Sequence, residues 1–221
     1  MITPLLEVLT IHFFNQLTFS VPHLLQFATT TENPGYGHAE IIFYHRAVSV
    51  SLFRPVAGPT YLAVEVICGH LDWQVSSMAQ IFNILSPLSS TVVNLSLVYG
   101  EHTLSSEGHN QADRTQWRKL LGSFRNVKTL RVHNGLVGEV SRSLRLDGEQ
   151  PSELRPELNE LICPPGSRDD RSFTSFIHER EVAAGQPIEL IEHAFPVGRS
   201  EREFITSSGY VYFSTYAVPV L

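Results

Sequence analysis

The chain has 221 residues, 43% of them hydrophobic and 17% charged, so it can bury a sizeable core and is not a disordered chain. The formal charge is -6 and the 16 basic residues are scattered, so no basic stripe is expected and a nucleic-acid partner is not predicted. Glu7 interrupts an N-terminal apolar stretch that no Lys or Arg precedes, which predicts neither a signal peptide nor a membrane span. We therefore expect a cytoplasmic or nuclear protein without a membrane partner.

Short alternating apolar runs and amphipathic helical patterns follow one another along the chain. Strands are predicted at 6–11, 62–68, 92–98, 127–133, 158–163 and 187–192, because each run has the length and alternation of a strand with one buried face. Helices are predicted at 21–28, 75–82, 113–124, 136–144 and 170–184, where apolar residues recur at helical spacing. Residues 39–53 are expected to form a hairpin-like insertion. This alternation favours parallel strands joined by helices.

Several single residues carry local predictions. Asp113, with Gln116 three residues later, has the spacing of a capping box, and Asn134 is expected to cap the helix that follows it. The last helix is expected to stop at Gly185. Trp73 and Trp117 are expected to pack in the core rather than to form a ligand-stacking platform. The two cysteines, Cys68 and Cys163, lie far apart in apolar runs and are interpreted as buried thiols.

Four of the predicted strands share one spacing of apolar residues. Their apolar positions match the L-x-x-L-x-L pattern of a leucine-rich repeat. The four matches are Leu6-x-x-Leu9-x-Ile11, Val92-x-x-Leu95-x-Leu97, Val127-x-x-Leu130-x-Val132 and Leu158-x-x-Leu161-x-Cys163. The spacings of 35 residues (Leu95 to Leu130) and 31 residues (Leu130 to Leu161) are longer and less regular than the usual period. The predicted fold class is α/β, a degenerate leucine-rich-repeat-like β/α solenoid arc with a mostly parallel sheet. A doubly wound sheet shares the signature, and would show a reversal of strand order with helices on both faces.

The outward face of these strands is the candidate binding site. If the repeat residues point into the core, strand alternation turns a set of polar residues onto the opposite face. This predicted polar strip consists of Asn94, Ser96, Thr129, Arg131, His133 and Glu160. Solenoids bind partners along such continuous faces, so we expect a partner-binding role for the set, although a solvated strand face is the simpler interpretation of any single member.

The sequence gives little support for catalysis or for a cofactor. None of the sharper metal, nucleophile-elbow or phosphate-loop motifs appears among the ten histidines and their surroundings. His102 and His109 share a polar loop with Glu101 and Glu107 and could hold a metal transiently, but loop histidines are ordinarily solvated. A Ser-His-Asp arrangement from distant segments stays open, because triads assemble across the chain. We predict no catalytic residue, no metal site and no cofactor.

Four segments carry a resemblance to a known family. "HLDWQVSSMAQIFNILSPL", "DRTQWRKLLGSFRNVKTLRVHNGLVGEVSRSLRLD", "PELNELICP" and "SFTSFIHEREVAAGQPIEL" resemble, in wording and order, the C-terminal leucine-rich-repeat region of fungal F-box proteins. The resemblance runs from about Pro4 to Glu192. In that family an F-box docks onto the Skp1-type adaptor of a cullin ubiquitin ligase, while the repeats select the protein to be ubiquitinated. No F-box is present in this chain, so the adaptor is an expected partner only if an upstream F-box exists.

These observations divide the chain into a leucine-rich-repeat-like domain at 1–192 and a tail at 193–221 outside the repeat pattern. The expected function is a non-enzymatic protein–protein interaction module resembling the substrate-recognition arm of an F-box (SCF ubiquitin ligase) protein, with a protein substrate that the sequence does not identify. Two alternatives stay open: a hydrolase-like α/β enzyme, and a scaffold or gene fragment without a ubiquitin-related role.

Overall fold

The computed structural model describes residues 8–14, 35–53, 61–100, 113–144, 157–167, 171–185 and 187–194. The predicted helix at 21–28 and the polar loop that holds His102 and His109 lie outside the described residues, as does the tail from 195 onward. The remaining predicted strands and helices can be compared with the structure.

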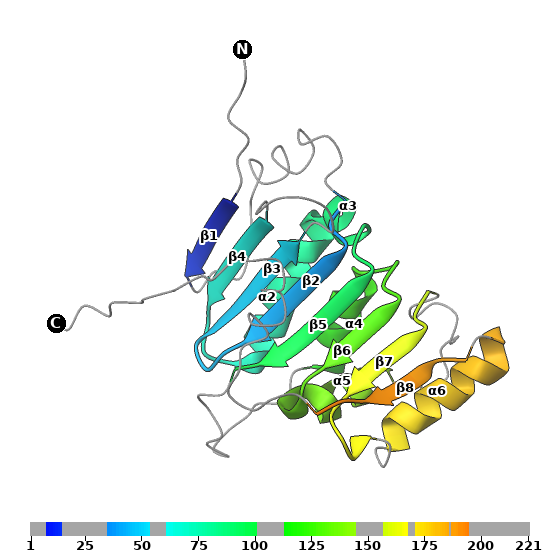
Figure 1. The fold of residues 1–221 in the computed structure, drawn as a ribbon. Coiled ribbons are helices and arrows are strands. Elements are labelled where there is room, and N and C mark those ends of the chain that lie inside the picture. Colours follow the sequence, from blue (N-terminus) through cyan, green and yellow to red (C-terminus); the bar gives the residue numbers. More distant parts are fainter. Residues whose placement is uncertain are drawn as a thin grey trace.

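Eight strands form one open sheet in the order β1-β4-β3-β2-β5-β6-β7-β8 (Figure 1). Their bounds are β1 (Val8–Phe14), β2 (His38–Phe43), β3 (Ala47–Phe53), β4 (Tyr61–Ile67), β5 (Asn94–Tyr99), β6 (Thr129–Val132), β7 (Glu160–Cys163) and β8 (Glu189–Glu192). β3 is antiparallel to both neighbours, β2 and β4, and every other pairing in the sheet is parallel. The predicted α/β class with a mostly parallel sheet is confirmed.

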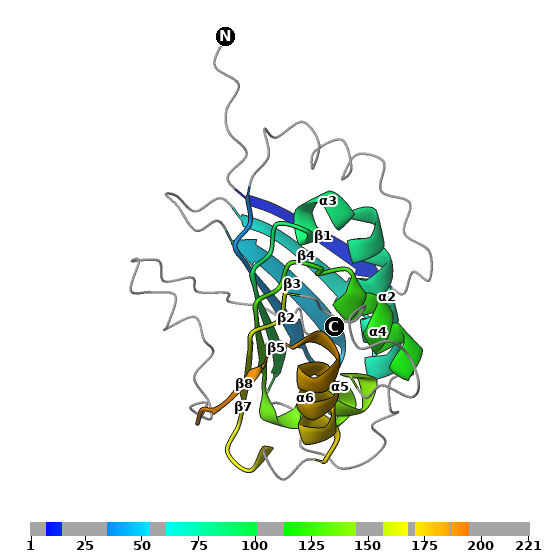
Figure 2. The ribbon, with the colours of Figure 1, turned by 90° about the vertical axis from the view of Figure 1, so that its right-hand side faces the viewer.

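The helices are α2 (Leu71–Ile84), α3 (Ser86–Ser89), α4 (Arg114–Gly122), α5 (Val137–Leu144) and α6 (Arg171–Ala184), with a short 3-10 turn, η2 (Asn134–Leu136). Figure 2 shows them together on one face of the sheet. α2 packs against α4, α4 against α5 and α5 against α6, so the helices form a row that crosses the strands. The opposite face of the sheet carries none of these helices.

The strand order has two parts. β2 and β3 form the predicted hairpin, and β4 adds to the outer side of β3. α2 then leads the chain from β4 back across β3 and β2, and from β5 to β8 the strands are neighbours in chain order. The order therefore reverses once, but the helices stay on one side. β8, the last strand of the sheet, has only four residues and carries an exposed carboxylate at each end, Glu189 and Glu192.

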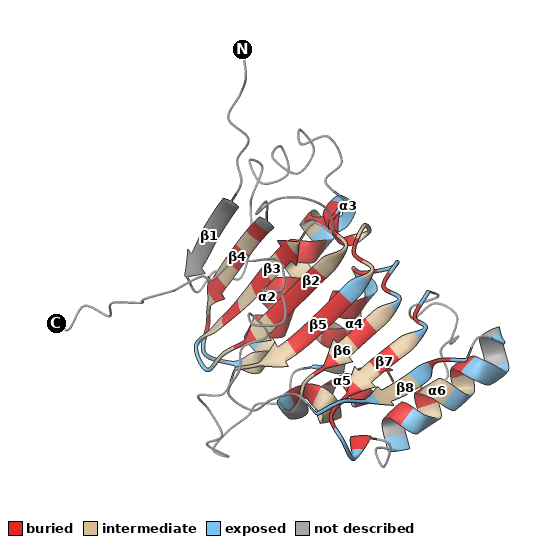
Figure 3. Cartoon of the chain, viewed as in Figure 1, coloured by how far each residue is buried: buried red, intermediate tan, exposed pale blue. Residues whose placement is uncertain are grey.

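The hydrophobic core lies between the sheet and the row of helices. Buried and partly buried residues alternate along β3 and β4, as period-two patterning requires (Figure 3). The core residues of the later strands, which include Leu95, Leu97, Leu130, Val132 and Leu161, are at most 1% exposed. Burying such a side chain contributes about 1.5–3 kcal/mol relative to leaving it exposed.

Aromatic rings fix the contacts within the core. Phe82 of α2 packs against Phe124 with ring centroids 4.4 Å apart, and Phe43 of β2 packs against Trp117 of α4 at 5.4 Å. Trp117 is fully buried, as its helical spacing predicts. These two pairs join α2 to the segment that follows α4, and α4 to β2 near the centre of the sheet.

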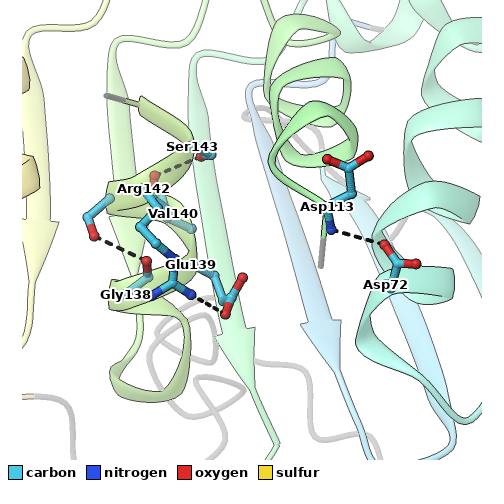
Figure 4. A network of polar contacts seen from close by, with 8 residues as sticks. Asp72, Asp113, Gly138, Glu139, Val140, Arg142 and Ser143 are labelled. Atoms are coloured by element: carbon cyan, nitrogen blue, oxygen red, sulfur yellow. Dashed lines mark hydrogen bonds and ion pairs between the residues drawn. The ribbon is translucent and has the colours of Figure 1, made fainter. Parts of the chain in front are cut away.

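The N-terminus of α4 is capped, but not by a capping box. The side chain of Asp113 accepts a hydrogen bond from the backbone N–H of Thr115 at 2.9 Å, which confirms the predicted cap. The backbone N–H of Asp113 donates to Asp72 Oδ1 at 3.0 Å rather than to Gln116, so the predicted capping box is wrong (Figure 4). Asp72 lies in the first turn of α2. It can reach Asp113 because α2 packs on α4 and the first turns of the two helices lie side by side.

Polar contacts link α4 to α5 and support α5 itself. Arg118 Nε donates to the carbonyl oxygen of Ser143 at 3.1 Å, across the two helices. Within α5, Arg142 forms an ion pair with Glu139, and the Ser143 hydroxyl donates to the carbonyl of Val140 at 2.7 Å (Figure 4). Of these bonds, the one from Arg118 links the two helices, and the other two support α5.

Two predicted helix boundaries have different outcomes. Gly185 has φ +65° and its N–H donates to the carbonyl of Glu181 at 3.0 Å, which confirms the predicted glycine stop of α6. Asn134 opens η2, directly before α5, but its side chain lies outside the described residues. Its capping role therefore stays a prediction.

The prediction that Trp73 packs in the core is wrong, because this side chain is 48% exposed. Trp73 lies roughly 160° around α2 from Val75, at about 100° per residue, and Val75 is fully buried. Its ring instead contacts His70 edge-on, with centroids 5.1 Å apart. A position near a helix start in apolar surroundings did not indicate which side of the helix would face the core.

The different burial of the two tryptophans predicts separable fluorescence signals. In the Trp73→Phe variant, emission comes from Trp117 alone, and we expect acrylamide to quench it weakly until urea unfolds the chain. In the Trp117→Phe variant, emission comes from Trp73, and we expect strong quenching of the folded protein. Stern–Volmer slopes measure both. Equal slopes for the two folded variants would contradict this packing.

Candidate functional site

The predicted polar strip lies across β5, β6 and β7, on the face of the sheet opposite the helices. In the strand register Asn94 pairs with Thr129, Thr129 with Glu160, and Ser96 with Arg131. His133 directly follows β6, and its backbone N–H donates to the carbonyl of Leu97 at 2.9 Å, which continues the ladder. Neighbouring strands lie about 4.8 Å apart, so the six residues form one contiguous patch.

The members of the strip differ in how far a partner could reach them. Asn94 is exposed, and Thr129, Arg131, His133 and Glu160 are half-buried. Ser96 is only 1% exposed, so the expectation that it would offer a contact to a partner is corrected. Its short side chain lies in register between the longer side chains of Glu40 and Arg131.

A side-chain hydrogen bond joins two strands within the strip. The hydroxyl of Thr129 donates to Glu160 Oε2 at 3.1 Å, from β6 to β7. This bond orients the carboxylate of Glu160 along the sheet and holds the two strands' polar side chains in a fixed relation. The strip is therefore a structured surface in this part, rather than a row of independent solvated side chains.

β2 adds two residues to this face that the sequence analysis missed. His38 pairs with Asn94 and Glu40 with Ser96, so the polar row continues from β5 onto β2. Glu40 is only 6% exposed, and a buried carboxylate is costly unless it has polar partners. The polar residues at alternate positions of "HAEIIF" could have predicted this extension. Because the segment was interpreted as an insertion, it was not considered as part of the binding face.

The strip has the chemistry of a recognition surface. Glu40 and Arg131, of opposite charge, lie on either side of Ser96 in one row, and Glu160 lies on the next row. Amide, hydroxyl and imidazole groups fill the positions between them. Such a surface can match a partner's charges and hydrogen bonds over several strands, which gives specificity more than affinity.

Among the residues that the structure describes, no three His, Cys, Asp or Glu side chains gather in a way that could hold a metal ion. None of the helices in this part of the chain is long and apolar enough to cross a lipid bilayer.

Both cysteines are buried free thiols, as their apolar surroundings predict. Cys68 directly follows β4 and Cys163 ends β7, and four other strands lie between these two in the sheet. Burial raises the pKa of the Cys68 thiol from 9.0 to about 11, so at neutral pH it is protonated and a poor nucleophile. Neither its position nor its pKa gives Cys68 a catalytic environment.

Comparisons with known proteins give this geometry no relative. A scan against protein-family models finds no match, and searches of curated proteins and of solved structures find none either. The resemblance to fungal F-box proteins therefore rests on the four sequence segments alone.

The raised pKa of Cys68 predicts a loss of stability in alkali. Between pH 9 and pH 11 the unfolded chain releases the thiol proton while the folded chain retains it, so the free energy of unfolding falls as the pH rises, by up to about 1.4 kcal/mol per pH unit. We expect urea unfolding of Cys68→Ala to show a shallower decline over this range. Tyrosine and lysine titration affects both proteins alike, so parallel curves would contradict the prediction.

Proposed function

We propose that the chain is a non-enzymatic protein-interaction module whose partner binds the polar strip. The observation that supports this most directly is the position of the strip's residues, which lie in register on β5, β6 and β7 on the face that the helices leave uncovered. His38 and Glu40 extend this surface onto β2. A protein partner could thus contact four adjacent strands at once.

We also propose that β5 to β8 form a degenerate leucine-rich-repeat arc. Two features support this. Each of β5, β6 and β7 is followed by a helix of the same row. Each strand also buries, on the helix side, the residues at the final two apolar positions of the L-x-x-L-x-L pattern. In a leucine-rich repeat, each unit buries its strand against the structure behind it and contacts only its neighbours. The β2–β3 hairpin and β4 would then be an insertion beside the first of these units.

The resemblance to fungal F-box proteins gives the partner a class. We propose that residues 1–192 act as the substrate-recognition arm of a ubiquitin ligase subunit, and that the bound protein is one to be ubiquitinated. A Skp1-type adaptor would bind only through an F-box encoded upstream. Reading the 5′ end of the native transcript tests this part: an in-frame F-box supports it, and its absence leaves a scaffold as the better account.

We do not propose the hydrolase-like alternative. A doubly wound enzyme sheet places helices on both faces, with a site at the carboxyl ends of the strands. α2, α4, α5 and α6 all lie on one face, although the strand order does reverse once. No specific observation on the described residues favours a hydrolase over a binding module.

The proposal predicts that Arg131→Ala combined with His133→Ala weakens binding to a partner that uses the strip. The partner is captured by cross-linking, purified, and titrated against the full chain by calorimetry. We expect Kd to rise at least about ten-fold, or about 1.4 kcal/mol, because both side chains lie within the patch.

A matched control removes the same residue types from another part of the sheet. His45 and Arg46 are exposed in the turn between β2 and β3, so His45→Ala with Arg46→Ala should leave Kd unchanged. Thermal unfolding checks that both double variants fold. If Arg131→Ala with His133→Ala binds every captured partner as tightly as the control does, the strip is not the binding site.

A further inference from the structure

A second surface lies on the helix side of the molecule, away from the polar strip. A groove of about 860 Å³ runs between α2 with α3 on one side and α4 with the segment after it on the other. This volume lies within the range of about 300–1,000 Å³ that ligand sites occupy. The close pairing of Phe82 with Phe124, at 4.4 Å, joins the two walls. At the end of the groove next to α3, Asn126 Nδ2 donates to the carbonyl oxygen of Ser90 at 2.6 Å and joins the two walls there.

The charge of this groove is one-sided. Lys119 and Arg125 lie in its α4 wall, and the described residues that line it include no Asp or Glu. Both cations are exposed, and in the described part of the chain neither side chain forms a hydrogen bond or an ion pair. The groove of this acidic chain, of formal charge -6, thus holds two cations that have no carboxylate partner within the described ranges.

The surrounding sequence shows the same bias. Six of the 16 Lys and Arg residues fall between 114 and 131, namely Arg114, Arg118, Lys119, Arg125, Lys128 and Arg131. The next acidic residue after Asp113 is Glu139. The basic residues are therefore less scattered than the sequence analysis assumed, and α4 with its flanks carries a concentrated positive charge.

The opposite wall and the ends of the groove offer neutral polar groups. Gln80 and Asn83 come from α2 and Gln116 from α4, and none of these three amides makes a side-chain hydrogen bond among the residues that the structure describes. Serine hydroxyls, including that of Ser123, also line the groove. Amides and hydroxyls can bond a peptide backbone, while the two cations can pair with carboxylates.

We propose that this groove binds an acidic peptide segment of a partner protein. Charge complementarity selects the ligand, because Lys119 and Arg125 have no carboxylate partner among the residues that the structure describes, and the chain as a whole is acidic. The groove follows two helices and is open to solvent, which suits an extended segment. This surface is separate from the polar strip, so the proposal does not depend on the function proposed above.

The test uses the full chain and a fluorescein-labelled peptide of alternating glutamate and glycine, with the glutamine–glycine peptide as its neutral counterpart. Lys119→Gln with Arg125→Gln removes the two groove cations. Arg46→Gln with Arg171→Gln is the matched control, because both arginines are exposed, make no side-chain ion pair within the described residues, and lie outside the groove lining. Each double variant has the formal charge -8, that is -6 less two positive charges.

We expect fluorescence anisotropy to show binding of the glutamate peptide and not of the glutamine peptide. Raising the salt from about 0.01 M to about 0.1 M shortens the Debye length from about 30 to about 10 Å and should weaken this binding. The groove variant should lose at least about ten-fold in affinity and the control less than about two-fold. Circular dichroism verifies that both variants are folded.

Three results would overturn the proposal. The first is no binding of the glutamate peptide at low salt. The second is an equal loss of affinity in the groove and control variants, which would indicate attraction to positive charge anywhere on the chain. The third is displacement of the peptide by inorganic phosphate that chloride at the same ionic strength does not reproduce, which would indicate a small-anion site instead.

Discussion

The parallel pairing of β2 with β5 is the contact on which the rest of the structure depends. It joins the hairpin part of the sheet to the run from β5 to β8, over six residue pairs from His38 with Asn94 to Phe43 with Tyr99. Further bonds secure both ends. The N–H of Gly100 donates to the carbonyl of Phe43 at 2.8 Å, and at the other end the backbone N–H of Tyr36 donates to the Thr91 hydroxyl at 3.0 Å. The packing of Phe43 of β2 on Trp117 of α4 adds a second contact between the two parts.

The one-sided row of helices follows from the same junction and leaves the other face of the sheet without these helices. α2 must cross β3 and β2 to deliver β5, and it occupies the face on which α4, α5 and α6 then pack in turn. The other face carries polar side chains of β2, β5, β6 and β7 in register with one another. Two surfaces of different character result, a mixed-charge strip on the strands and a positive groove between the helices.

Local patterns predicted most of the elements, and contacts between distant segments account for the errors. β6 and β7 were located from their strict alternation, and the stop of α6 from Gly185, because these depend on neighbouring residues. Asp72 could not be predicted as the partner of Asp113, since 41 residues separate them and only the packing of α2 on α4 brings them together. Ser96 was assigned to the correct face, but its burial depends on the residues beside it on β2 and β6.

The last strand has a consequence for how copies of this chain behave in a crowded solution. Among the described residues β8 is the last strand of the sheet, and an edge strand presents backbone groups to which another strand could add. β8 offers only four residues for such an addition, and the carboxylates of Glu189 and Glu192 stand at its two ends. Two copies meeting at this edge would bring like charges together and gain few hydrogen bonds. The short length and the negative charges of β8 therefore disfavour the pairing of one copy's sheet with that of another copy.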